Sequence, residues 1–199
     1  MKALFSLLLI LSISFSASLV QAQDQNVAQV ELSGFGGPMI QVTGFDEETA
    51  VMVGAGAALL VSQRFYIGGY GMVMASPIER TLEFAGQPDQ DLTIGFNQFG
   101  IWLGYIVNPD NKVQATVNSH IGFGSLNPQE LDQNDRVYMI SPHAGVQYAA
   151  SDWLRIELNA GYRVMGNVNS SQVISQLFSN QSLSAPFGGL TLRFGGFRQ

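Results

Sequence analysis

The chain has 199 residues and a formal net charge of −6, and it contains no cysteine. The acidic balance argues against a nucleic-acid-binding protein, because phosphate recognition needs clustered cations. The missing thiols exclude disulfides, thiolate metal sites and cysteine nucleophiles. Charged residues make up 12% of the chain. Soluble domains carry roughly 25%, so the sequence favours a protein with little water-exposed surface.

The first 22 residues have the pattern of a secretory signal peptide. Lys2 precedes an apolar run over 3–11, and the sequence Val20-Gln21-Ala22 marks a cleavage site before Gln23. The run is shorter than the roughly 20 apolar residues that a membrane-spanning helix needs. No cysteine follows it, which excludes a bacterial lipoprotein anchor. We therefore expect a signal peptide over 1–22 and one exported domain over 23–199.

Alternation of apolar and polar residues with period two predicts eight β-strands in this domain. In chain order they cover 28–44, 49–61, 65–75, 91–107, 112–124, 136–148, 153–166 and a last segment around 190–194. The first strand is interrupted at Gly36-Gly37-Pro38, where a bulge or bend is expected. The fourth strand is apolar on both faces near Trp102, which leaves its register open.

These strands are typical of an all-β fold, a closed antiparallel β-barrel that spans a membrane. After the signal peptide, no apolar segment is long enough for a transmembrane helix. The seventh strand alternates most clearly, since Leu154, Ile156 and Leu158 are interleaved with Arg155 and Glu157. A soluble barrel would face its polar residues to water, but they are too sparse here for a water-exposed surface. We therefore expect the apolar faces to contact lipid.

The connections between the predicted strands alternate in length. Short turns are expected at 62–63, 108–111 and 150–152, and longer loops at 76–90, 126–135 and 167–185. A short connection at 46–48 belongs to the second series. Outer-membrane barrels have short periplasmic turns and longer outer loops, and eight strands fit this rule with both termini in the periplasm.

Aromatic residues gather at the strand ends, as they do at membrane–water interfaces. One group adjoins the short turns and the end of the last strand: Phe65, Tyr66, Tyr105, Tyr148, Trp153, Phe194 and Phe197. The other group lies at the opposite strand ends: Phe45, Phe123, Tyr138 and Phe187. Both groups are predicted to form aromatic belts.

The interior of an eight-stranded barrel is just wide enough for side chains to fill it. Polar residues of the strands are expected to form a structural network there, in which opposite charges pair and offset their desolvation. Its predicted members are Glu31, His120, His143, Arg155, Glu157, Arg163 and Arg193. No catalytic, cofactor-binding or metal-binding residue is predicted.

Two histidines and a serine on the predicted lumen face are the residues with potential for chemistry. His120 and His143 lie on strands predicted to be neighbours, which fits a metal pair, an acid–base pair or, as we favour, two hydrogen-bonded lumen residues. Ser141 shares a face with His143, as in a barrel hydrolase. Ser119 and His120, however, point to opposite faces, and no oxyanion donor is evident.

The end of the chain resembles a known family. Gly161-Tyr162-Arg163 and the segment 188–197 are similar to the last hairpin of small outer-membrane β-barrel proteins of Gram-negative bacteria, the OmpA/OmpX-like and porin-like group. The resemblance covers 23–199 in pattern. It implies contact with outer-membrane lipid and lipopolysaccharide, and insertion by the barrel assembly machinery. Family members often end on an aromatic residue, whereas here Arg198 and Gln199 follow Phe197.

The predicted outer loops differ in charge. Ten of the 15 acidic residues lie in or beside the first three loops: Asp46, Glu47, Glu48, Glu79, Glu83, Asp89, Asp91, Glu130, Asp132 and Asp135. A solvated rim is the favoured interpretation, and divalent cations that bridge to lipopolysaccharide are the alternative. The fourth loop is uncharged over 167–186 and carries an apolar stripe that could cap the barrel: Val173, Ile174, Leu177 and Phe178.

These features favour a non-enzymatic surface barrel with a structural role, a role in adhesion or a role in an envelope complex. The alternative is a narrow porin-like pore for small solutes, and a lipid-modifying outer-membrane enzyme is a more distant one. The filling of the lumen separates the first two, because side chains paired across a narrow interior leave no continuous water column.

Overall fold

The computed structural model describes residues 30–45, 48–82, 90–128, 135–169 and 183–197, so the predicted signal peptide lies outside the described residues. Nine β-strands occur in this part of the chain. They are β1 (Leu32–Phe45), β2 (Glu48–Val61), β3 (Phe65–Met74), β4 (Ile78–Leu82), β5 (Gln90–Val107), β6 (Val113–Pro128), β7 (Asp135–Ala149), β8 (Leu154–Asn169) and β9 (Ala185–Gly195). Among the described residues, no helix is long and apolar enough to cross a membrane.

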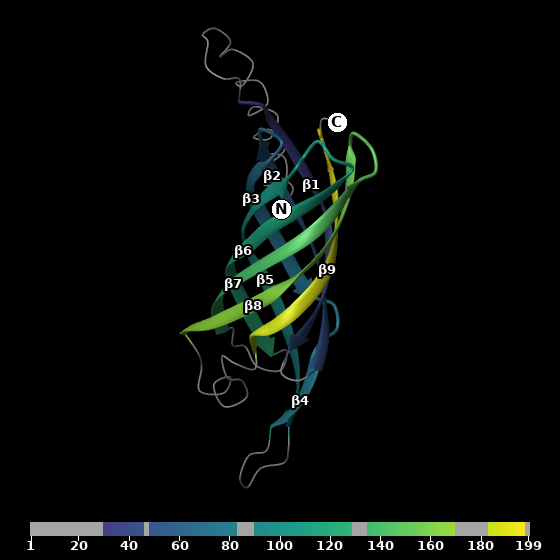
Figure 1. Ribbon diagram of the computed structural model, residues 1–199. Coiled ribbons are helices and arrows are strands. Elements are labelled where there is room, and N and C mark those ends of the chain that lie inside the picture. Colours follow the sequence, from purple (N-terminus) through teal and green to yellow (C-terminus); the bar gives the residue numbers. More distant parts are fainter. Residues whose placement is uncertain (1–29, 46–47, 83–89, 129–134, 170–182, 198–199) are drawn as a thin grey trace, which may run out of the picture. The chain divides into compact units, whose positions relative to one another are not determined.

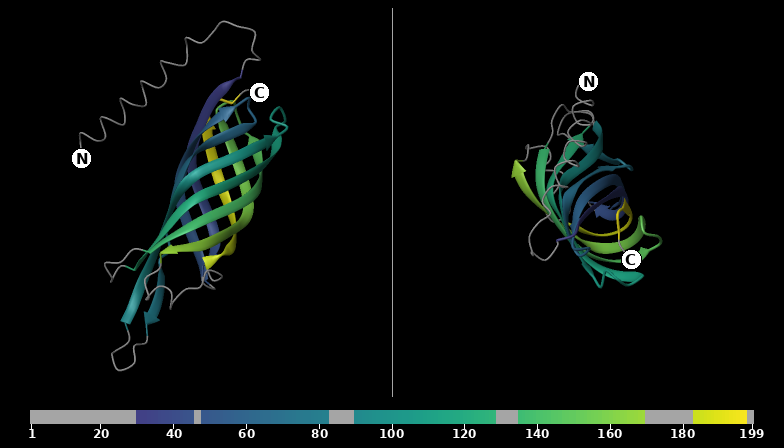
Figure 2. Two further views of the ribbon diagram at one scale, coloured as in Figure 1. Left: turned by 90° about the vertical axis from the view of Figure 1, so that its left-hand side faces the viewer. Right: turned by 90° about the horizontal axis from the view of Figure 1, so that it is seen from above.

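The strands close into an antiparallel barrel within the unit Glu31–Gln199 (Figures 1 and 2). The first strand, β1, pairs with both β2 and the last strand, β9, and the pairing of β3 with β5 completes the circle. Both β3 and β4 pair with β5, one after the other along its edge, so nine strands fill eight positions around the barrel. The predicted eight-stranded barrel is confirmed.

The two ends of the barrel differ. Three short connections at 62–64, 108–112 and 150–153 lie at one end, which we call the turn end. Both described termini lie there as well, because Ser62 N–H donates to the Glu31 carbonyl and Phe197 N–H donates to that of Asp152. The opposite, loop end carries the longer connections, whose tips at 83–89, 129–134 and 170–182 lie outside the described residues.

The first long loop is shorter than predicted. Part of the segment expected to be loop at 76–90 is the strand β4, which pairs with 90–94 of β5. This hairpin projects beyond the barrel wall at the loop end (Figure 1). The strands β6 and β8 likewise continue to Pro128 and Asn169, into the segments 126–135 and 167–185 expected to be loops.

The expected bulge in β1 is absent. The register of β1 with β2 runs without a shift through Gly36, Gly37 and Pro38. The local irregularity is a gap in the pairing with β9, which skips Gly37 and Pro38 and resumes at Met39. Proline has no N–H to donate, and a Cβ at Gly37 would clash with the Leu192 carbonyl oxygen. The glycine and proline therefore accommodate close strand packing without an extra residue.

Side chains alternate between a buried inner face and an exposed outer face. Trp102 settles the register that was open in β5, since its side chain is buried while Ile101 on the adjacent position is half exposed. The described outer face is rich in exposed apolar side chains: Ile40, Val42, Leu59, Ile67, Val73, Phe99, Ile101, Val117, Ile121, Ile140, Val146, Leu158, Val164 and Leu190. Such a belt is what a lipid-facing barrel surface requires.

The predicted aromatic belts are correct only in part. Five members at the turn end face outward: Phe65, Tyr105, Tyr148, Trp153 and Phe194. At the loop end Phe123 and Tyr138 do so too. In contrast, Tyr66, Phe197, Phe45 and Phe187 are buried inside the barrel. Proximity to a strand end does not decide the face, because neighbouring residues such as Phe65 and Tyr66 must point in opposite directions.

The lumen has an apolar side and a polar side. The inward side chains of β2 and β3 are apolar or tyrosine: Ala50, Met52, Ala58, Leu60, Tyr66, Tyr70, Met72 and Met74. The inward side chains of β6 to β9 include most of the buried polar groups: Gln114, Thr116, Asn118, His120, Ser141, His143, Gln147, Arg155, Glu157, Arg163, Thr191 and Arg193. The interior is therefore a packed core in which polar groups meet aromatic rings.

Candidate functional site

A buried ion pair lies in the middle of the lumen. Glu157 on β8 and Arg193 on β9 pair through Oε2 and Nη2, and both side chains are 1% exposed. The second carboxylate oxygen, Oε1, accepts hydrogen bonds from Thr116 Oγ1 at 2.7 Å and from Asn118 Nδ2 at 2.8 Å. A buried charge is tolerated when it is paired and hydrogen-bonded, and this carboxylate is paired through Oε2 and hydrogen-bonded through Oε1.

Three aromatic rings enclose the guanidinium of Arg193. Its Cζ lies 5.0, 4.8 and 4.9 Å from the ring centroids of Phe35, Tyr66 and Trp102. The three rings meet one another edge to face at 5.1–5.3 Å. Arg193 Nη2 also donates to the Tyr66 hydroxyl at 2.7 Å, and that hydroxyl donates to Asn118 Oδ1. Cation–π attraction is strongest when water is excluded, as it is here.

These seven residues, Phe35, Tyr66, Trp102, Thr116, Asn118, Glu157 and Arg193, form what we call the central cluster. It reaches from one wall of the barrel to the other. Arg193 on β9 and Trp102 on β5 are four strand positions apart in either direction around the barrel, yet they are in contact. The cluster therefore crosses the full width of the lumen.

A second set of contacts across the lumen, which we call the Arg163 crossing, lies at the loop end. Arg163 Nη2 donates to the Gly44 carbonyl at 3.0 Å and to that of Leu183 at 3.4 Å. Its guanidinium also lies 5.6 and 5.7 Å from the rings of Phe45 and Phe96. Strands β8, β1 and β5 thus meet at this level as well.

The remaining predicted network residues lie elsewhere. Arg155 is buried near the turn end, with its guanidinium 4.6 Å from the Phe197 ring. Glu31 precedes β1, is half exposed and accepts a hydrogen bond from Gln63 Nε2 at 3.2 Å. The charged residues predicted to meet as one network are therefore spread along the barrel axis, and Glu157 and Arg193 form an ion pair at its centre.

The two histidines lie beside the central cluster. Their ring centroids are 4.8 Å apart, and the ring of His120 stacks on that of Tyr70 at 4.1 Å. His143 Nδ1 lies 3.0 Å from the backbone carbonyl of Ser141, and a carbonyl can only accept, so this nitrogen carries the proton. The residue pair considered for a hydrolase is thus joined through the main chain of Ser141.

The aromatic and amide members of the central cluster were not among the predicted network residues. Tyr66 is next to a short turn, a position that predicts a belt, and Trp102 lies in a strand without visible alternation. Two glycines carried a usable signal. A Cβ on Gly104 would overlap the Tyr66 phenol, and one on Gly145 would lie 2.7 Å from Glu157 Oε1. Glycines on the inner face of strands thus indicate where large lumen side chains lie.

No family model matches the chain, and no curated protein matches it in sequence. Among solved structures, the crystal structure of Neisserial surface protein A matches with a TM-score of 0.53 and 10% identity, over 84% of this chain and 97% of that one. The chain has the fold of a small outer-membrane β-barrel. Ail, the attachment invasion locus protein of Yersinia pestis, matches with a TM-score of 0.45 and 12% identity, over 84% of this chain and 97% of the other.

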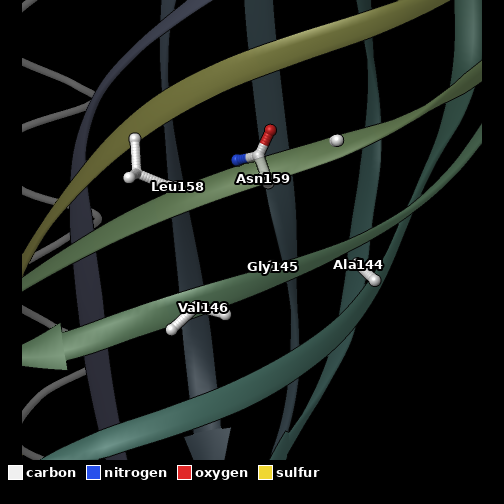
Figure 3. A pocket seen from close by; sticks show the side chains of 6 residues that line it. Ala144, Gly145, Val146, Leu158 and Asn159 are labelled. Carbon is white, nitrogen blue, oxygen red and sulfur yellow. The ribbon is translucent and has the colours of Figure 1, made fainter.

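One depression marks the outer surface of the barrel, over β7 and β8 (Figure 3). Its lining is Ala144, Gly145, Val146, Leu158, Asn159 and Ala160. Ala144 pairs with Ala160, and the larger Val146 pairs with Leu158. The hollow therefore forms where two small side chains lie next to two larger ones. None of the six lining residues is charged, and the depression therefore belongs to the apolar belt.

Proposed function

We propose that this chain is a non-enzymatic surface protein of a bacterial outer membrane, exported with residues 1–22 removed. The observation that carries the proposal is the contact of Arg193 with Trp102 across the lumen, inside a wall whose outer face is apolar. A barrel with lipid outside and a packed interior has its loops and its outer face as binding surfaces. Those surfaces would serve any of the three roles: a structural role, adhesion, or membership of an envelope complex.

The packed interior argues against the alternative of a solute pore. The central cluster and the Arg163 crossing obstruct the lumen at two levels, and long side chains held by hydrogen bonds and ring contacts leave no continuous column of water. Lipid modification is the enzymatic alternative. It would need a serine hydroxyl hydrogen-bonded to a histidine nitrogen, whereas the contact between His143 and Ser141 runs from Nδ1 to the main-chain carbonyl of Ser141 and leaves the serine hydroxyl out.

The proposed partners follow from the two outer surfaces. The apolar belt would contact outer-membrane lipid and lipopolysaccharide, and insertion would depend on the barrel assembly machinery. Divalent cations would bind acidic side chains at the loop end. Of the ten acidic residues predicted there, Glu48, Glu79, Asp91 and Asp135 lie on described strands, and the other six lie outside the described residues.

Cell fractionation tests the location. The mature protein should begin at Gln23, sediment with the outer membrane and migrate faster on a gel when unboiled, because a folded barrel stays compact in detergent. An epitope inserted at 129–134 should be labelled on intact cells, whereas the same epitope at 108–112 should be labelled only after permeabilisation. Recovery as a soluble periplasmic protein, or labelling of the turn rather than the loop, would contradict the proposal.

A further inference from the structure

The two histidines of the chain, the only two in its sequence, come together in the lumen. They lie 23 residues apart on the adjacent strands β6 and β7. The register pairs Asn118 with His143 and His120 with Ser141, so the histidines occupy diagonal positions on one face. Diagonal neighbours are within reach of long side chains, and here the ring centroids are 4.8 Å apart.

The protonation of His143 is set by its backbone partner. Because Nδ1 donates its proton to the Ser141 carbonyl at 3.0 Å, the neutral ring has its lone pair on Nε2. Histidines that bind metals usually donate their other ring N–H to a carbonyl or carboxylate, which fixes the ring and raises the basicity of the ligand nitrogen. His143 has this arrangement.

His120 contributes a second nitrogen. Its side chain is 3% exposed, and its Nε2 has no hydrogen-bond partner among the described residues. The hydroxyl of Tyr70 and the indole Nε1 of Trp102, whose rings contact the imidazole, lack partners in the same set. Buried polar atoms are nearly always satisfied by protein, water or an ion, so the unpaired nitrogen of His120 is available to a bound ion.

We infer that His120 and His143 form a two-imidazole binding site for a transition-metal ion inside the barrel. Imidazole favours Cu²⁺, Zn²⁺ and Ni²⁺, with Cu²⁺ bound most strongly of the divalent ions. No group of three or more potential side-chain ligands occurs among the described residues, so water completes the coordination. Glu157 is paired with Arg193, so its carboxylate does not supply a further ligand.

Copper titration tests the site. The untagged full chain is folded in detergent, treated with a chelator and titrated with Cu²⁺, with metal content and the electron paramagnetic resonance spectrum as readouts. We expect one ion per barrel with nitrogen hyperfine splitting from two imidazoles. Either H120Q or H143Q should weaken binding at least tenfold, and the double variant should abolish the nitrogen signal. Zn²⁺ should compete with Cu²⁺ in the wild-type protein only.

The comparison requires that the variants are folded. Faster migration of each unboiled variant on a gel establishes this. H120F preserves the ring stack on Tyr70 and serves where H120Q does not fold. Adventitious binding to the acidic loop end would survive in all variants and would show oxygen ligands. Equal copper content in wild type and double variant, or no copper retained by the wild type, would overturn the inference.

Discussion

Gly145 on β7 leaves the space that the carboxylate of Glu157 on β8 occupies. A Cβ at position 145 would lie 2.7 Å from Glu157 Oε1, 2.8 Å from the Leu158 carbonyl oxygen and 2.9 Å from Thr116 Oγ1. These distances are shorter than a carbon–oxygen contact allows, and two of the three atoms belong to the central cluster. The position of the buried acid is therefore coupled to the absence of a side chain on the neighbouring strand.

The first prediction follows from this close approach. The substitution G145A should destabilise the barrel by about 1–3 kcal/mol, the usual cost of overpacking a filled core. The matched control is G69A on the outer face, where the nearest atom to a new Cβ is 3.7 Å away. Urea unfolding in lipid vesicles measures both. Equal stability of the two variants would show that the space beside Glu157 is not constrained.

The second prediction concerns the ion pair. E157Q keeps the shape of the side chain but leaves the Arg193 guanidinium buried without its counter-charge, which should cost about 3–5 kcal/mol. The double variant E157Q/R193M should cost less than the sum of the two single variants, because no uncompensated charge remains. The same unfolding assay completes this double-mutant cycle. Additive costs would mean that the two residues do not interact.

The polar strands were the part of the fold that could be predicted most directly. In β8 the inner residues Arg155 and Glu157 are charged and the outer Leu158 is apolar, so the sequence itself marks the two faces. On β2 and β3 both faces are apolar, because the lumen side is filled by residues such as Met52 and Met72. Alternation then disappears from the sequence, although the strands are as regular as the others.

The central cluster could be predicted only in its charged members. Ionised residues on strands of a membrane barrel must face inward, which identified Glu157 and Arg193. Their partners depend on which strands lie opposite each other and on the tilt that sets their relative height. The contact of Arg193 with Trp102 joins strand positions far apart around the barrel. No local pattern in either strand carries that information.

The third prediction tests the lipid-facing surface. Leu158 is 66% exposed on the outer face of β8. If it lies near the bilayer midplane, L158R should cost about 2–4 kcal/mol, as charged substitutions at that depth do. The control N111R places the same side chain on an exposed turn residue and should be neutral. Comparable stability of the two variants in lipid vesicles would contradict an outer face in contact with lipid.

The fourth prediction uses the two tryptophans. Trp153 is 59% exposed at the turn end and stacks on Phe194, whereas Trp102 is 2% exposed inside the lumen. In the variant W102F, the fluorescence of Trp153 should be quenched by lipids brominated near the headgroup. In W153F, the remaining Trp102 should resist both brominated lipid and aqueous acrylamide. Strong acrylamide quenching of Trp102 would indicate a water-filled interior.

The central claim, a lumen closed by packed side chains, is tested most directly by the conductance of the purified, refolded protein in planar bilayers. Arg193 with its ring contacts and Arg163 with its carbonyl partners obstruct the interior at two levels, so the wild-type barrel should insert without giving a steady current. A stable ohmic conductance that scales with the number of inserted barrels would contradict the claim and favour the pore.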